Sequence, residues 1–238
     1  YHLTSDLVDQ AIRYLADHVG DNAELPWLTW LAFGACHAPH QAPFDLISKY
    51  DAVFADGWDV ERERRLARQI KLGIVPMGTR LPPRNDVVRP WAEVAEPERR
   101  LFTRLQAAYA AMLEHADQHI GRLVSFLEAS GQLDDTLVIV MSDNGASQEG
   151  GPFGMVNAMG PYNLRRETLD EKVARIEDIG GPDTHSNFPL GWAMAANTPL
   201  RRYKQNTHGG GIRDPLVMTW DRGIAARGEL RHQFCHAS

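Results

Sequence analysis

The sequence predicts an α/β fold in which a mostly parallel β-sheet is sandwiched between helices, and three observations support this prediction. Five consecutive apolar residues, Leu137 to Met141, show no polar alternation, which is typical of a strand covered on both faces. A long stretch with apolar residues at helical spacing comes before this strand, and another apolar run lies near the start of the chain. Strand, helix and strand in this order favour a layered fold with parallel pairing.

Composition excludes several classes of protein. With 238 residues and 43% hydrophobic content, the chain is long enough to bury a sizeable core. A formal net charge of -6 argues against a general nucleic-acid binder, whose surface is normally basic. No apolar run approaches the roughly 20 residues that a transmembrane helix needs. Cys36 and Cys235 are the only cysteines, so no disulfide framework is indicated.

The first part of the chain predicts a helix, a strand, a loop and a second helix. Apolar residues recur at helical spacing from Leu7 to Val19, behind a Thr-Ser pair that can cap the helix. Trp27 to Phe33 predicts a buried strand. The stretch from Gly34 to Pro43 contains two prolines and must be a loop. From Asp59 to about Leu72, the charged sequence indicates another helix.

The second part predicts the longest helix and two further strands. A Pro-rich excursion from Pro76 to Pro90 comes first. Pro97 then starts a helix whose apolar stripe ends near Gly131. This helix leads into a strand from Thr136 to Met141, and a short helix is expected around Leu169 to Ile179. Pro215 to Trp220 predicts one more strand.

The apolar run at Leu137 leads directly into Asp143, Asn144 and Gly145. In open parallel sheets, ligands bind just beyond the carboxyl ends of the strands. Carboxylate and amide oxygens are hard donors of the kind that Ca²⁺ or Mg²⁺ prefers, and a glycine allows a tight turn. The same three residues also suit an ordinary turn after a strand. From these residues alone, both interpretations stay open.

His37 and His40 lie in the loop after the first predicted strand, a position where loops often carry function. Histidine there can donate a proton, act as a neutral ligand or donate a hydrogen bond to an anion. Alternatively, both histidines cap a turn and face solvent. A zinc site is disfavoured because no Cys or Glu stands at a companion spacing.

Lys204 lies in a basic stretch that runs from Arg201 into Gly209-Gly210-Gly211. A lysine beside a flexible glycine turn can hold a small anion. The arginines can equally be surface charges and the glycines a mobile loop. Taken together, the three loops offer an oxygen-ligand pair, a histidine and a lysine. Such a set suits a divalent cation that clamps an anionic ester.

Three motifs in order resemble those of the sulfatases, specifically bacterial-type arylsulfatases of the alkaline phosphatase superfamily. They are Ala38-Pro39-His40, Ser142-Asp143-Asn144-Gly145, and Asn197-Thr198-Pro199-Leu200-Arg201 through Lys204 to His208-Gly209-Gly210-Gly211-Ile212-Arg213. The resemblance implies an alkaline-phosphatase-like fold and a sulfuric ester hydrolase that acts on a small-molecule sulfate ester, with no nucleic-acid partner.

The resemblance also implies roles for individual residues. Asp143 and Asn144 match an Asp-Asn pair that helps to bind Ca²⁺, which is expected here in preference to Mg²⁺. His40, rather than His37, matches the histidine that contacts the sulfate and protonates the leaving alkoxide. Lys204 matches the sulfate-binding lysine. His40 and Lys204 are therefore the expected catalytic and substrate-binding residues.

The family's nucleophile is a formylglycine made from the Cys or Ser of a Cys/Ser-x-Pro-x-Arg motif. Neither Cys36 nor Cys235 has a proline two positions on. The resemblance therefore implies that residues 1–238 are the central portion of a single catalytic domain, incomplete at both ends, with the formylglycine upstream. Alone, this portion is expected to be inactive and prone to aggregate. The alternatives are a phosphate or phosphonate monoester hydrolase and a catalytically inactive anion-binding module.

Overall fold

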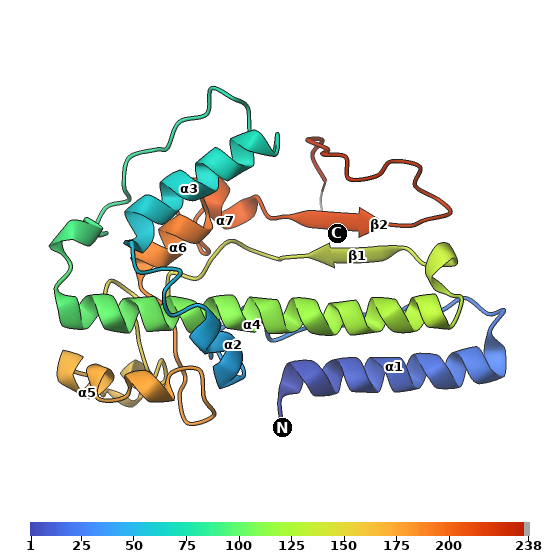
Figure 1. The fold of residues 1–238 in the computed structure, drawn as a ribbon, viewed down its shortest axis with the longest axis horizontal. Helices are drawn as coiled ribbons and strands as arrows, with labels where there is room; N and C mark the ends of the chain where they lie inside the picture. The colour runs from blue at the N-terminus through green and yellow to red at the C-terminus, as the bar shows by residue number, and fades with distance from the viewer. Residues whose placement is uncertain (236–238) are drawn as a thin grey trace.

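The computed structural model describes residues 1–235, and the long helix α4 organises them (Figure 1). α4 spans Glu96–Ala129, close to the predicted limits. Helix α1 (Leu3–Asn22) and the short helix α2 (Phe44–Lys49) pack against it. α1 begins four residues before the predicted apolar stripe, and the His2 side chain caps it. The buried apolar stripe of α4 comprises Leu101, Phe102, Leu105, Ala108, Ala111 and Met112.

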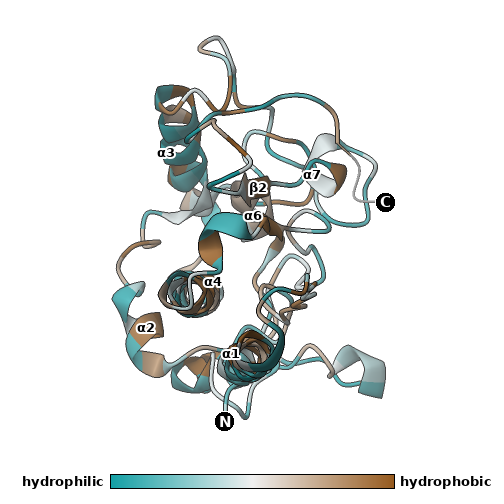
Figure 2. Ribbon diagram, turned by 90° about the vertical axis from the view of Figure 1, so that its right-hand side faces the viewer, coloured by the Kyte–Doolittle hydropathy of each residue, from teal (hydrophilic) through white to brown (hydrophobic). Residues whose placement is uncertain are grey.

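A cluster of aromatic side chains joins α4 to α3 (Gly57–Lys71) and α6 (Leu190–Ala196). The ring centroids of Trp58 and Trp192 are 5.8 Å apart, and Trp192 donates a hydrogen bond from Nε1 to the carbonyl oxygen of Phe102 at 2.9 Å. Figure 2, which looks along α4, shows α3 and α6 on one side of that helix and α1 on the other. Buried aromatic rings contribute large apolar areas, so this cluster is the centre of the core.

The remaining helical elements are short. The helix predicted from Leu169 to Ile179 is divided into α5 and a 3₁₀ turn, and the Pro-rich excursion from Pro76 to Pro90 is irregular, as expected. No helix among the described residues is long and apolar enough to cross a membrane. The short helices and 3₁₀ turns are η1 (Trp91–Glu93), η2 (Leu133–Asp135), η3 (Pro161–Asn163), α5 (Leu169–Val173), η4 (Ile176–Asp178) and α7 (Gly209–Ile212).

The predicted strands at Thr136–Met141 and Pro215–Trp220 are both present, as β1 (Val138–Met141) and β2 (Leu216–Thr219). They pair antiparallel, with Val138 opposite Thr219. The mostly parallel sheet that the sequence predicted is not found among residues 1–235, where this pair is the whole sheet. An apolar run predicts a strand but does not encode its direction relative to a neighbour, because both pairing modes use the same side-chain alternation.

Two further predictions about the strands are wrong for the described residues. β1 is not covered on both faces, because Ile139 is 49% exposed. Trp27 to Phe33 is extended but pairs with no strand, and Trp30 is 84% exposed. A strand requires a neighbour that accepts and donates backbone hydrogen bonds. The apolar pattern alone does not show whether that neighbour is present.

Candidate active site

Asn197, at the C-terminal end of α6, joins the loop after β1 to the loop that carries Lys204. Its side-chain oxygen accepts a hydrogen bond from the amide of Ala146 at 3.0 Å. Its side-chain nitrogen donates to the carbonyl oxygens of Arg202 at 2.9 Å and Gly210 at 2.8 Å. The amide of Lys204 also donates to the carbonyl oxygen of Ala146, at 3.1 Å. Two of the three motif-bearing loops therefore lie side by side.

Gly145 allows these two loops to approach closely, and Gly210 allows the Lys204 loop to pack against itself. A Cβ atom at position 145 would lie 1.7 Å from the carbonyl oxygen of Gly210. A Cβ atom at position 210 would lie 2.1 Å from the carbonyl oxygen of Arg202. Only glycine fits at either position without moving the backbone, so Gly145 serves the contact between the two loops and Gly210 serves the packing within the Lys204 loop.

His37 brings the third loop to the same place. Its Nε2 atom lies 3.1 Å from Nζ of Lys204. Its Nδ1 atom lies 2.9 Å from the carbonyl oxygen of Ala38, which can only accept. In the neutral ring, Nδ1 therefore carries the proton and Nε2 accepts from the lysine ammonium. A proton added to the ring would go to Nε2, on the side that faces Lys204.

Glu149 completes this group of side chains. Its Oε1 atom lies 3.5 Å from Nζ of Lys204, and its Oε2 atom lies 3.8 Å from Nε2 of His37. Lys204 is mostly buried, with 21% of its side chain exposed. The carboxylate thus faces both of the groups that could bind an anion.

His40 lies elsewhere, inside the protein. It is 0% exposed, and its ring packs against Tyr109 and Phe188, with centroids 5.1 and 5.0 Å away. Neither ring nitrogen has a hydrogen-bond partner. Burial, with smaller contributions from His37 and His185, lowers the pKa of His40 to about 3. His40 is thus enclosed in the core, whereas His37 faces Lys204.

Asp143 and Asn144 follow β1 directly, as the sequence predicted. Asp214, beyond α7, lies near them: burial raises its pKa, and the negative charge of Asp143 raises it further. Carboxylate and amide oxygens are donors of the kind that Ca²⁺ takes, and a cation beside Asp143 and Asp214 would offset the repulsion between the two carboxylates. Within residues 1–235, no group of three His, Cys, Asp or Glu residues is arranged to hold a metal by itself.

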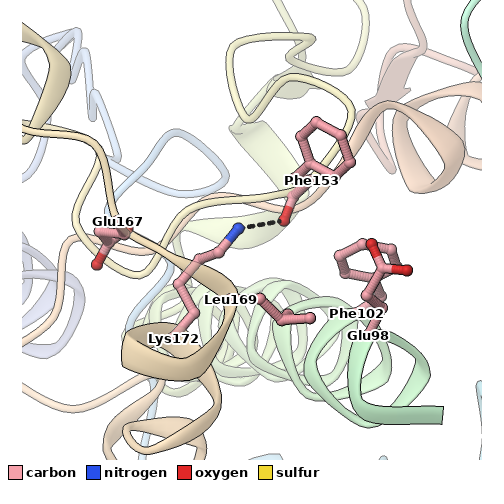
Figure 3. Close-up of a pocket in the computed structure, with 6 residues that line it drawn as sticks. All are labelled: Glu98, Phe102, Phe153, Glu167, Leu169 and Lys172. Carbon is pink, nitrogen blue, oxygen red and sulfur yellow. Dashed lines mark hydrogen bonds between the residues drawn. The ribbon is translucent and has the colours of Figure 1, made fainter. Parts of the chain in front are cut away.

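A separate pocket of about 240 Å³ lies between α4 and α5 (Figure 3). Lys172 points into it, but its ammonium donates to the carbonyl oxygens of Phe153 at 3.0 Å and Gly154 at 3.2 Å. Burial lowers the pKa of Lys172, against the opposing effect of Glu167 and Glu98. Since the charge is already hydrogen-bonded to backbone, Lys172 is explained as a structural residue. None of the three motifs contributes a residue to this pocket.

The sequence did not identify Glu149 or Asp214. The motif resemblance selected His40 rather than His37 as the sulfate-binding histidine, and of the two it is His37 that lies beside Lys204. Glu149 stands six positions after Asp143, inside the loop already identified, so its nearness to the site was a usable signal. The choice between His37 and His40 depends on burial. Two histidines three positions apart in a loop do not reveal which one faces inward.

A family model described as Sulfatase matches residues 1–238. An uncharacterized sulfatase of Schizosaccharomyces pombe is 33% identical over 195 residues, which are 82% of this chain and 34% of that protein. An arylsulfatase of Klebsiella aerogenes is 29% identical over 209 residues, 87% of this chain and 43% of that protein. A sulfatase of Formosa agariphila is 27% identical over 183 residues, 74% of this chain and 24% of that protein. The chain thus spans less than half the length of these relatives.

Two solved structures of Ps i-CgsB are also similar. The structure in complex with k-i-k-neocarrahexaose has a TM-score of 0.42 and 20% identity, covering 92% of this chain and 28% of that one. The second structure has a TM-score of 0.44 and 19% identity, covering 94% of this chain and 29% of that one.

Proposed function

We propose that this chain, which belongs to the sulfatase family, supplies the anion-binding and proton-donating groups of an enzyme that hydrolyses sulfate monoesters. The observation that carries the proposal is the 3.1 Å contact between Lys204 and His37 beside the loop that begins with Asp143 and Asn144. The arylsulfatase of Klebsiella aerogenes and the two other relatives named sulfatases support a sulfate ester over a phosphate or phosphonate ester.

In this proposal, Lys204 binds the sulfate oxygens as a point charge, and its low exposure reduces competition from water. His37, protonated at Nε2, gives that proton to the bridging ester oxygen as the bond to sulfur breaks. The alcohol or phenol then leaves as a neutral molecule. A general acid of this kind typically contributes about 10²–10⁴-fold to the rate. We therefore transfer to His37 the role that the motif resemblance gave to His40.

Asp143 and Asn144, with Asp214 nearby, are the proposed Ca²⁺ ligands in this chain. When bound, the ion would neutralise negative charge on the sulfate oxygens. We propose that the nucleophile is a formylglycine outside residues 1–238, because neither cysteine stands in the motif that the family modifies. The 238-residue chain alone is accordingly expected to show no turnover of an aryl sulfate.

The test compares His37→Ala with His40→Phe in the complete enzyme, using phenyl sulfate and 4-nitrophenyl sulfate. Phenoxide is the poorer leaving group and depends more on protonation. His37→Ala should therefore lower kcat about 10²-fold or more for phenyl sulfate and much less for 4-nitrophenyl sulfate. His40→Phe keeps an aromatic ring against Tyr109 and Phe188, so it should leave kcat for both esters nearly unchanged.

An equal loss for the two esters in His37→Ala would mean that His37 binds the sulfate but donates no proton. A leaving-group-dependent loss in folded His40→Phe, with none in His37→Ala, would return the acid role to His40. Absence of aryl sulfate hydrolysis by the unmodified, fully processed enzyme would contradict the proposed function itself.

A further inference from the structure

Glu149 occupies a position that needs an explanation beyond the proposed chemistry. Its carboxylate faces Lys204 at 3.5 Å and His37 at 3.8 Å, the two groups that the proposed function assigns to the ester. A negative group at this place competes with an anionic substrate for the same donors. Without a compensating function, the Glu149 carboxylate would only weaken the binding of the anionic ester.

Hydrogen bonds hold the Glu149 side chain where it is. Ser147 donates from Oγ to Oε2 at 3.0 Å, and Gln205 donates from Nε2 to Oε1 at 3.1 Å. Gln148 also donates to Gln205, at 3.0 Å, which ties the Glu149 loop to the Lys204 loop. The backbone is constrained as well, since a Cβ atom on Gly150 would lie 1.9 Å from the carbonyl oxygen of Phe188. The carboxylate is therefore a fixed part of the site.

We propose that Glu149 makes this site select monoanionic esters over dianionic ones. The inference rests on the proposed function and concerns the same site. The charges of Lys204 and Glu149 cancel, so with protonated His37 the three side chains carry one net positive charge, which matches one negative charge on an ester. A sulfate monoester carries one negative charge, whereas a phosphate monoester acquires its second negative charge near pH 6. The Glu149 carboxylate repels the second negative charge of the phosphate. The repulsion is large because the two groups would be only a few ångströms apart.

The experiment measures dissociation constants by calorimetry between pH 5 and 8 on the complete, calcium-loaded protein. Phenyl phosphate is the probe that gains a charge over this range, and phenylmethanesulfonate is a matched probe that remains a monoanion. In the unmodified protein, the ratio of the phosphate to the sulfonate dissociation constant should rise about tenfold or more from pH 5 to pH 8. Glu149→Gln keeps the shape of the side chain, its amide oxygen can still accept from Gln205, and its amide nitrogen can donate to Ser147 Oγ. It should reduce that rise by about tenfold.

Glu128→Gln is the matched control, because it removes an exposed carboxylate from α4 that faces none of these groups. It should leave the rise unchanged. An identical pH dependence in the unmodified protein and in Glu149→Gln overturns the inference. So does an equal weakening of both probes in Glu149→Gln, since that would show that Glu149 only positions Lys204.

The two proposals fail separately in this design. Binding is measured without turnover, so a protein that discriminates between the probes but hydrolyses no sulfate ester contradicts the proposed function and supports the selectivity. A protein that hydrolyses aryl sulfates and does not discriminate contradicts the selectivity alone.

Discussion

The aromatic cluster around α4 and the β1–β2 pair both consist of apolar side chains but differ in burial. Trp192 is 0% exposed, whereas Val217 in β2 is 61% exposed. The cluster receives side chains from α3, α4 and α6, so each ring is surrounded. Within the described residues, the strands pair only with each other. Apolar sequence thus predicts a preference for burial, and the neighbouring elements decide whether burial occurs.

The candidate active site lies where these two regions meet. α6 ends at Asn197, whose side chain contacts the loop after β1. The loop with Lys204 therefore follows a buried helix, α6, whereas the loop with Asp143 follows an exposed strand, β1. Loops that bind ligands are most precise when a rigid element supports them. We expect substitutions in the core to affect the protein most and substitutions in the strand pair to affect it least.

The largest expected effect tests the buried side of this comparison. Trp192→Ala should lower the free energy of unfolding by about 3–5 kcal/mol, because it empties a fully enclosed site and removes the indole hydrogen bond to the Phe102 carbonyl oxygen. Trp30→Ala makes the same chemical change at an exposed position and should cost less than about 0.5 kcal/mol. Urea titration measures both, and similar losses in the two variants would contradict the contrast in burial.

An intermediate effect is expected where α1 meets α4, since histidines pack there. Nε2 of His115 lies 3.1 Å from Nε2 of His119, and Nδ1 of His119 lies 2.8 Å from the Arg122 guanidinium. Arginine only donates, so His119 accepts at Nδ1 and carries its proton at Nε2. Burial, with His2 and His119 adding to it, lowers the pKa of His115 to about 4. The folded contact therefore requires neutral rings.

The sign follows from the unfolded chain, in which a histidine has a pKa near 6.5. As the pH falls from about 6.5 to about 4, the unfolded chain binds a proton that folded His115 does not, so the free energy of unfolding falls by roughly 1–3 kcal/mol. His115→Gln should remove this part of the pH dependence in urea titrations at pH 7.5, 6 and 4.5. His232→Gln, at an exposed position, should retain it. If the free energy of unfolding of His115→Gln falls with pH as much as that of the unmodified protein, the buried His115 is not the cause of the fall.

The smallest effect on stability is expected in the strand pair. Val217→Lys should change the free energy of unfolding by less than about 0.5 kcal/mol, because the valine is largely exposed. It should also keep more of the 238-residue chain monomeric, since a lysine on an exposed strand opposes pairing between chains. Light scattering at increasing concentration measures this. Val156→Lys, at a position with 0% exposure, is the contrasting variant and should prevent folding.

Local pattern was sufficient for the three longest helices, α1, α3 and α4, and for both observed strands, but not for the short helices α2, α6 and α7. α4 was predicted within two residues at its C-terminal end, because a stripe of apolar residues and an N-terminal proline depend only on the helix itself. The strand expected at Trp27 to Phe33 was not found, and the observed pairing is antiparallel rather than parallel. Both of these properties depend on which segment lies alongside, and the periodicity of one segment does not contain that information.

In the candidate active site too, residues in local motifs could be named from the sequence, whereas contacts between distant segments could not. Asp143, Asn144 and Lys204 could be named because each stands in a motif next to an apolar run. Glu149 could not be given a role, since its contacts with Lys204 and His37 join positions 55 and 112 residues apart in the chain. The contact through Asn197 joins positions 51 residues apart. These relations exist only once the loops are packed.

The sequence by itself determined the family, the places of the three longest helices and of both observed strands, and the residue types available for an anion and a cation. Each of these follows from local spacing and from side-chain chemistry. Only the tertiary structure decided that His40 is enclosed while His37 faces Lys204, and that the Glu149 carboxylate lies beside both His37 and Lys204. The physical reason is that burial and proximity are properties of the packed chain, in which distant segments exclude water from one side chain and leave its neighbour exposed.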